Sequence, residues 1–111
     1  MSDPRLPTQV KQPWEERIYN FDFRAASVPA DKHLVPAGRT IASVDSVEVL
    51  ASTPSGDTDL TAGPPTTDND ATVQAKFTGG TDGQDYPVRV RIVDDLGQRL
   101  EGDAIMQVRD L

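Results

Sequence analysis

The stretch YPVRVRIV, residues 86–93, decides the fold class. One face carries Tyr86, Val88, Val90 and Ile92, and the other carries Pro87, Arg89, Arg91 and Val93. This unbroken alternation is typical of a β-strand with one buried face. Turn residues bound the stretch on both sides, GGTDG at 79–83 and DDLG at 94–97. The sequence therefore predicts a strand here, with its apolar face toward a core.

Similar alternation recurs on both sides of this stretch. In RIYNFDF, 17–23, and ATVQAKF, 71–77, the residues on one face are Tyr19, Phe21 and Phe23, and Val73, Ala75 and Phe77. Within 39–50, Ile41, Val47 and Val49 share a face but Val44 falls out of phase, which predicts a bulge near Ser43 and Val44. The final run, 98–111, predicts a strand that is bent or bulged around Gly102.

The segments between these strands have the composition of turns and loops. Two prolines and Gly38 close the connection 25–38, and Pro, Gly, Thr and Asp fill 51–70, where we expect a long surface loop with a short strand about Asp59 to Ala62. No segment has the period of a long amphipathic helix. Five clear strands and one or two weak ones at roughly 10-residue spacing predict a single all-β domain at 17–111, an antiparallel β-sandwich.

Residues 1–16 differ from the rest. They hold Pro4, Pro7 and Pro13, and their apolar residues are scattered singly, so we expect an extended proline-rich arm. Trp14, the only tryptophan, either anchors the arm in a neighbouring protein or folds back as a plug over one end of the sandwich. Leu6 and Val10 on the same arm favour docking within the chain or between chains. Our predicted partner-binding residues are therefore Leu6, Val10 and Trp14, and deletion of 1–16 is expected to leave a folded sandwich.

Composition excludes several functions. The chain has 111 residues, a formal net charge of −7, one histidine and no cysteine. No disulfide or thiolate chemistry is therefore available, and a lone His33 cannot form a His-rich metal cluster. The negative charge without a basic run makes nucleic acid a poor partner. No apolar run is long enough for a signal peptide or a membrane span, so we expect a soluble protein made in the cytoplasm.

The acids of the long loop are candidates for calcium binding. Asp57, Asp59, Asp68 and Asp70, with Asn69, could supply oxygen ligands. Their spacing lacks the central glycine and the distal glutamate of a helix-loop-helix calcium site, which favours solvated loop acids. We expect no cofactor and no metal.

The acidic pairs and the single histidine do not form a pattern that is typical of an enzyme active site. Glu15-Glu16 and Asp94-Asp95 are adjacent pairs, whose side chains point to opposite faces of an extended chain and cannot flank one substrate atom. His33 lies in a proline-flanked loop, and no serine has the G-x-S-x-G motif around it, so we interpret His33 as an exposed loop histidine.

The GGTDG turn followed by Tyr86 resembles the tyrosine corner of immunoglobulin-type sandwiches. There a tyrosine near the start of a strand turns its hydroxyl back to a backbone group a few residues upstream. Gly83 supplies the turn and Tyr86 the hydroxyl, and we interpret both as structural residues. The predicted sandwich is therefore immunoglobulin-like.

Several segments in order carry a wider resemblance. They are Pro13 with Glu15-Glu16 leading into 19–23, then 38–44, the 79–83 turn with Tyr86, 97–99, and the closing 106–108. Together they resemble the immunoglobulin-like fiber-tail adaptor proteins of short-tailed bacteriophages. The resemblance implies a non-enzymatic virion protein, present in several copies in a symmetric assembly, that links the tail tube or nozzle to the fibers. Its implied partners are other tail proteins, with no nucleic acid and no membrane.

An alternative from another class is an immunoglobulin-like carbohydrate- or surface-binding module. Such a module needs exposed aromatic side chains, and most of the one Trp, two Tyr and three Phe are needed for the core. A secreted adhesin also needs a signal peptide, which we do not expect here.

Overall fold

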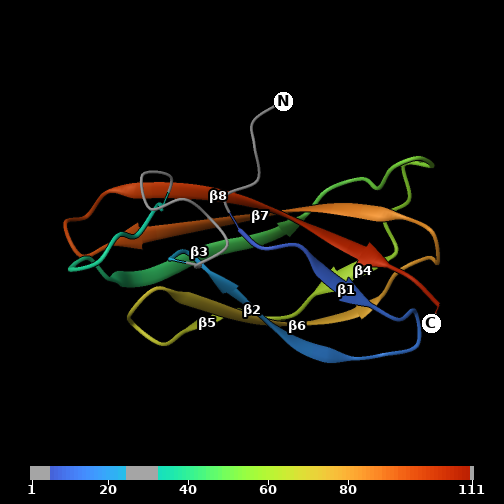
Figure 1. Cartoon of the computed structure of the whole chain (residues 1–111), viewed down its shortest axis with the longest axis horizontal. Helices are drawn as coiled ribbons and strands as arrows, with labels where there is room; N and C mark the ends of the chain where they lie inside the picture. The colour runs from blue at the N-terminus through green and yellow to red at the C-terminus, as the bar shows by residue number, and fades with distance from the viewer. Residues whose placement is uncertain (1–5, 25–32, 111) are drawn as a thin grey trace.

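The computed structural model describes residues 6–24 and 33–110, which form eight strands and two packed sheets (Figure 1). The strands are β1 (Gln9–Lys11), β2 (Arg17–Asp22), β3 (Ile41–Val49), β4 (Leu60–Ala62), β5 (Thr66–Thr67), β6 (Thr72–Gly79), β7 (Asp85–Asp94) and β8 (Arg99–Val108). The part of the chain described here contains no helix that is long and apolar enough to cross a bilayer.

The two sheets have the strand order of an immunoglobulin-type sandwich. The first sheet has the order β1-β8-β7-β3, and the second has the order β2-β6-β4, with β5 also paired to β6. These correspond to the CFG and BED arrangements of that fold, with the first strand added beside the last. The predicted all-β sandwich is confirmed. Not every pair is antiparallel as expected, because β1 runs parallel to β8.

The predicted apolar faces form the core. Tyr86, Val88, Val90 and Ile92 of β7 are all buried, as are Tyr19, Phe21 and Phe23, and Val73, Ala75 and Phe77. The Phe77 ring packs edge-on against Phe21, with 5.7 Å between the ring centroids, and against Tyr19 at 6.0 Å. Such edge-to-face pairs add to the free energy gained by burial. The alternation in β2, β6 and β7 therefore identified the core correctly.

Two predicted details of the strands hold. The register of β3 against β7 shifts between Ile41 and Ser43 and again between Val44 and Ser46, so the expected bulge is present. β4 (Leu60–Ala62) lies within the short strand expected at 59–62. The sequence reading missed β5, which pairs only Thr66 and Thr67 with β6.

Of the bend or bulge predicted around Gly102, the bulge is absent. β8 pairs with β7 in an unbroken register from Asp85–Gln107 to Val93–Arg99. The glycine serves packing instead, because a Cβ added there would lie 3.1 Å from side-chain carbons of Leu6, Leu34 and Phe23. A glycine in a strand therefore marks a close approach of side chains here and not a break in the ladder.

The N-terminal segment takes part in the sandwich. Gln9, Val10 and Lys11 pair with 106–108 of β8 at a sheet edge, where a nearby proline does not interrupt a central ladder. The side chain of Leu6 is 2% exposed and belongs to the core. Of the arm predicted at 1–16, residues 1–5 lie outside the described part, as do 25–32 of the connection predicted at 25–38.

Candidate functional site

The connection between β1 and β2 is a tight turn with Trp14 at its tip. Pro13 and Trp14 occupy the central positions, and the Glu15 amide donates a hydrogen bond to the Gln12 carbonyl at 3.2 Å. Proline suits the first central position because its fixed φ matches the turn. The Glu15 carboxylate also accepts a hydrogen bond from the Gln12 amide at 3.0 Å. The turn is therefore held at both of its ends.

Lys11 holds the same turn from within. Its side chain is fully buried, and its ammonium donates hydrogen bonds to the carbonyls of Gln12 at 2.8 Å, Pro13 at 3.3 Å and Gly79 at 2.6 Å. A buried charge is stable only with such partners. Burial lowers the pKa of Lys11, and the nearby carboxylates of Glu15 and Glu16 offset part of that effect. The ammonium thereby joins the Trp14 turn to the end of β6.

The predicted partner-binding residues lie in different environments. The Trp14 side chain is 92% exposed, so it does not plug the end of the sandwich, and Val10 is 45% exposed. Leu6 lies in the core, which is the within-chain docking that the sequence left open, and it offers no surface to a partner in this structure. The predicted partner-binding residues did not include Ile18, which is 65% exposed near the start of β2 on its outward face.

Tyr86 and the loop between β3 and β4 are linked by hydrogen bonds at this same end. The Tyr86 hydroxyl accepts from the Thr81 amide at 2.8 Å and donates to Asp57 Oδ1 at 2.9 Å. Thr81 Oγ1 donates to Asp57 Oδ2 at 2.6 Å. These bonds, led by that from Thr81, lower the pKa of Asp57, whereas burial raises the pKa of Tyr86. Gly83 adopts a φ of +83° and its amide donates to the Val108 carbonyl at 2.9 Å.

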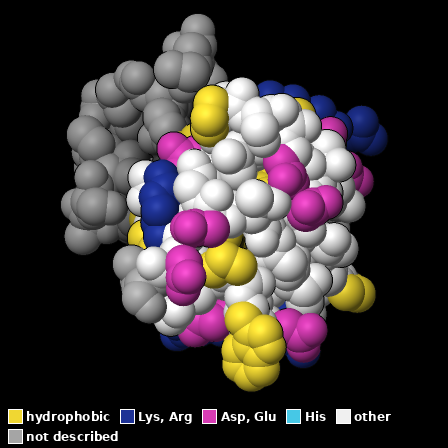
Figure 2. Space-filling view, turned by 90° about the vertical axis from the view of Figure 1, so that its right-hand side faces the viewer, with side chains coloured by type: hydrophobic (Ala, Val, Ile, Leu, Met, Phe, Trp, Pro, Cys, Tyr) yellow, Lys and Arg dark blue, Asp and Glu magenta, His cyan; other side chains and the backbone are white. Residues whose placement is uncertain are grey.

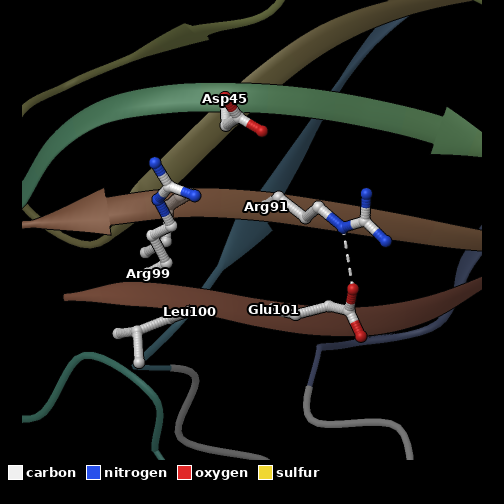
Figure 3. Close-up of a pocket in the computed structure, with 6 residues that line it drawn as sticks. Asp45, Arg91, Arg99, Leu100 and Glu101 are labelled. Atoms are coloured by element: carbon white, nitrogen blue, oxygen red, sulfur yellow. Dashed lines mark hydrogen bonds and ion pairs between the residues drawn. The ribbon is translucent and has the colours of Figure 1, made fainter.

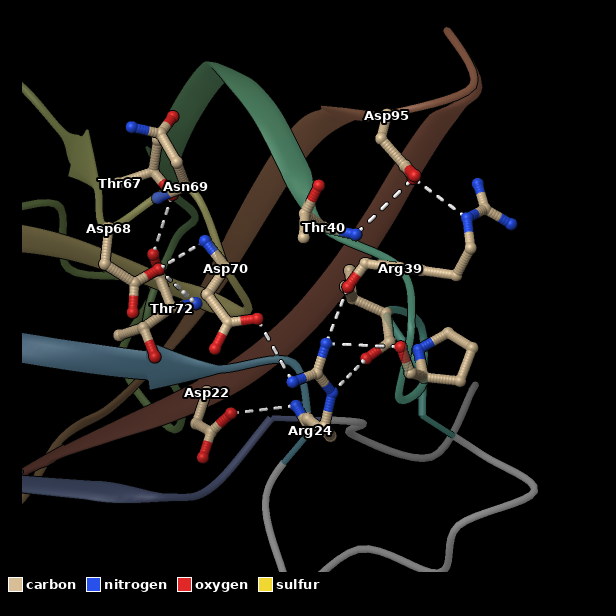
Figure 4. A network of polar contacts seen from close by, with 12 residues as sticks. Asp22, Arg24, Arg39, Thr40, Thr67, Asp68, Asn69, Asp70, Thr72 and Asp95 are labelled. Carbon is tan, nitrogen blue, oxygen red and sulfur yellow. Dashed lines mark hydrogen bonds and ion pairs between the residues drawn. The ribbon is translucent and has the colours of Figure 1, made fainter.

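The loop acids that were weighed as calcium ligands mainly organise their own loops. Asp68 accepts hydrogen bonds from the amides of Asp70 and Thr72, and Asp70 forms an ion pair with Arg24 at 3.1 Å (Figure 4). Asp57 accepts the hydroxyl hydrogens of Tyr86 and Thr81. Within 6–24 and 33–110, no group of three or more His, Asp or Glu is arranged to hold a metal ion.

Two arginines tie the loops at the opposite end. Arg24 donates to the carbonyls of Val35, Pro36 and Arg39, at 3.1, 3.2 and 2.6 Å (Figure 4). Arg39 binds Asp94 at 2.5 Å and Asp95 at 2.8 Å. The hydrogen bond that Arg39 donates to Asp95 is the main cause of the lowered pKa of Asp95.

The expectation that Asp94 and Asp95 point apart was wrong. β7 ends at Asp94, so the alternation of an extended strand does not continue to Asp95, and both carboxylates reach Arg39. Their shared cation makes them a structural pair. His33 is half-buried in the loop before β3 and not exposed as expected.

The outer face of the first sheet has a hollow of about 300 Å³, whose lining includes Arg91, Arg99 and Glu101 (Figure 3). Arg91 binds Glu101 at 2.8 Å and Arg89 binds Asp103 at 3.3 Å across β7 and β8. The bond from Arg91 lowers the pKa of Glu101. A carboxylate held ionised by arginine is a poor general acid at neutral pH. This arrangement is typical of a solvated sheet face.

Two comparisons with known proteins bear on the identity of the chain. No curated protein matches it. A family model described as podophage GP4 fiber-tail adaptor protein gp77 matches residues 11–107, which include the Trp14 turn, the Tyr86 corner and all strands from β2 to β7. The chain therefore belongs to the podophage fiber-tail adaptor family, whose members are structural proteins of the phage tail.

Proposed function

We propose that this tail protein joins the tail tube or nozzle to the tail fibers, with the sandwich as a rigid spacer and Trp14 and Val10 as residues that contact a partner. The family match over 11–107 carries this proposal, because it covers both the sandwich and the Trp14 turn. The protein works without catalysis and without a cofactor, in several copies arranged around the tail.

The turn at Trp14 supports a role in protein contact. Tryptophan is enriched among the residues that dominate binding energy at protein interfaces. An indole that is 92% exposed has most of its apolar surface available for burial by a partner. The clamp by Lys11 and Glu15 limits the motion of the turn, so little conformational entropy remains to be lost on binding.

The sandwich supports a role as a spacer. β7 and β8 run side by side over ten residues each, so they span about 30 Å along the long axis of 39 Å. The polar clusters at both ends fix the loops relative to these strands. A rigid body with separated ends suits a part that links two components of a tail.

A deletion and complementation experiment tests the adaptor function. Phage that lack this gene should produce particles whose tails carry no fibers, as seen by electron microscopy, and supplying the wild-type protein should restore them. Particles that keep a full set of fibers without the protein would contradict the proposal. Deletion of 1–16 alone is not a clean test, because it also removes β1, Leu6 and the buried Lys11 from the sandwich.

A further inference from the structure

The end of the sandwich that carries Trp14 is strongly acidic. We call it the Trp14 end and define it as residues 11–17, 50–59, 80–85 and 109–110. Among these described residues there are seven carboxylates and three cations: Glu15, Glu16, Asp57, Asp59, Asp82, Asp85 and Asp110, with Lys11, Arg17 and Arg109. Figure 2 views this end of the molecule, where acidic side chains spread over the surface and basic ones lie toward its margins.

The cations of this end are already engaged. Lys11 is buried on three carbonyls, Arg17 pairs with Glu15 at 3.4 Å, and Arg109 pairs with Asp85 at 2.6 Å. The exposed carboxylates that remain are those of Glu16, Asp59, Asp82 and Asp110. Of these, only Glu16 has a cation from residues 6–24 and 33–110 within ion-pair distance, Lys76 at 3.8 Å on the exposed face of β6. The surface around Trp14 therefore carries negative charge that no other cation of the described residues pairs with.

An exposed indole and an acidic surround make two separate demands on a partner. Burying the indole requires an apolar recess, because the ring gains free energy only where water is displaced from it. The surrounding carboxylates require cations, because like charges placed opposite each other oppose binding. A second copy of this chain, docked end to end, would bring two acidic ends together.

Resting on the proposed function, we infer that the Trp14 end docks on another tail protein whose surface carries lysine and arginine side chains around an apolar recess. Trp14 enters the recess and supplies most of the affinity. The carboxylates of Glu16, Asp59, Asp82 and Asp110 face the basic rim, speed the encounter and fix the orientation.

The test uses purified particles assembled without this protein, together with the purified chain at low and high salt. Wild-type binding should weaken about tenfold between about 50 and about 500 mM NaCl, since salt screens the charges of the rim. The double variant Glu16→Lys, Asp110→Lys should bind at least about tenfold less tightly at low salt and lose this salt dependence. Among the described residues, the Glu16 side chain forms only the 3.8 Å ion pair with Lys76. Asp110 is bonded to Asp82 through its backbone amide, which the substitution keeps.

A matched variant makes the same change in charge elsewhere. Asp45→Lys, Glu48→Lys alters exposed residues of β3 on the outer face of the first sheet, and its binding should stay within about twofold of wild type. Equal loss in the two double variants, or wild-type binding that does not weaken with salt, would overturn the inference. End-to-end dimers of the isolated chain that disappear in Trp14→Ala would overturn it as well.

The outcomes separate this inference from the proposed function. If Trp14→Ala abolishes binding while Glu16→Lys, Asp110→Lys binds normally, the adaptor function stands and the basic partner surface is wrong. If the wild-type chain does not bind these particles under any salt condition, the proposed function itself fails.

Discussion

The two ends of the sandwich are both closed by a cation bound to backbone carbonyls, and they differ in what they present to solvent. At the Trp14 end, Lys11 is fully buried under a turn that projects an indole outward. At the opposite end, which we call the arginine end, Arg24 binds loop carbonyls and the carboxylate of Asp70. Arg39 binds the carboxylates of Asp94 and Asp95 at the same end. The comparison shows that clamping a loop and offering a contact are separate properties, and that the Trp14 end combines them.

The choice of cation fits each end. An arginine carries five donors in a planar fork and can bridge several loops. Arg24, which follows the end of β2, binds residues before β3 and Asp70 in this way. A lysine has one compact ammonium with three donors, which suits three converging carbonyls in a buried position. The contact between the Trp14 turn and the end of β6 therefore depends on the single ammonium of Lys11.

The largest effect on stability is expected from Lys11→Met. The variant keeps the apolar part of the side chain but leaves three carbonyls without their buried donor, which should cost about 3 kcal/mol of unfolding free energy. Urea unfolding followed by far-UV circular dichroism measures it, and the tryptophan fluorescence of the folded variant reports whether the environment of Trp14 changes. Lys76→Met, an exposed lysine with one pair at 3.8 Å, is the control and should cost less than about 0.5 kcal/mol. Equal losses in the two variants would contradict the clamp.

At the arginine end, Arg24→Ala should cost about 2 kcal/mol. The substitution removes three bonds to carbonyls and one to Asp70, but the arginine is partly exposed and water can replace some of these partners. Arg24→Lys should recover less than half of the loss, because an ammonium cannot reproduce the fork. Thermal unfolding of the three proteins measures the series, and full recovery by lysine would show that charge alone matters there.

Tyr86→Phe should cost about 1 kcal/mol, a smaller loss at the Trp14 end. The ring stays in the core, while the Thr81 amide loses its acceptor and Asp57 loses a donor. A double-mutant cycle with Asp57→Asn, measured by urea unfolding, should show that the two losses are not additive. Additive losses would mean that the hydroxyl and the carboxylate act independently.

Acid should lower the unfolding free energy through one aspartate at each end, by less than the substitutions above. The pKa of Asp57 and of Asp95 is lower in the folded chain than the usual 3.8, so the folded state binds fewer protons than the unfolded state in this range. Their stabilising contribution is present above pH 3.8 and is lost as the pH falls through their folded pKa values. Urea midpoints at about pH 6 and about pH 3 should differ less in Asp57→Asn and in Asp95→Asn than in wild type. If a variant shows the same difference between the two urea midpoints as wild type, the aspartate that it replaces does not contribute to the acid sensitivity.

The sequence pattern predicts the parts of the fold that rest on alternation over many residues. The apolar face repeats three times or more along 17–23, β6 and β7, and the phase error at Val44 marks the bulge in β3. β1 and β5 are too short to show a period, and the parallel pairing of β1 depends on β8, almost a hundred residues away along the chain.

The candidate site was less predictable than the fold. Trp14 was identified from its residue type and its place after prolines, and the hydroxyl of Tyr86 from the turn before it. The role of Lys11 could not be predicted, because its partners are backbone carbonyls, which any residue supplies, and a lysine in a short polar segment reads as solvated. Arg24 and Arg39 were missed because their partners lie far from them along the chain, as Asp70 does from Arg24 and Asp94 from Arg39.

Replacing Trp14 by alanine has the smallest expected effect on stability and tests the central claim most directly. Trp14→Ala should change the unfolding free energy by less than about 0.5 kcal/mol, because the side chain is 92% exposed, yet it should reduce incorporation into phage particles more than about tenfold. Leu96→Ala, which removes an exposed apolar side chain at the arginine end, is the matched control. Quantifying the protein in purified particles from cells expressing wild type, Trp14→Ala or Leu96→Ala decides the matter. The account predicts loss in Trp14→Ala alone, and normal amounts of a folded Trp14→Ala protein in particles would contradict it.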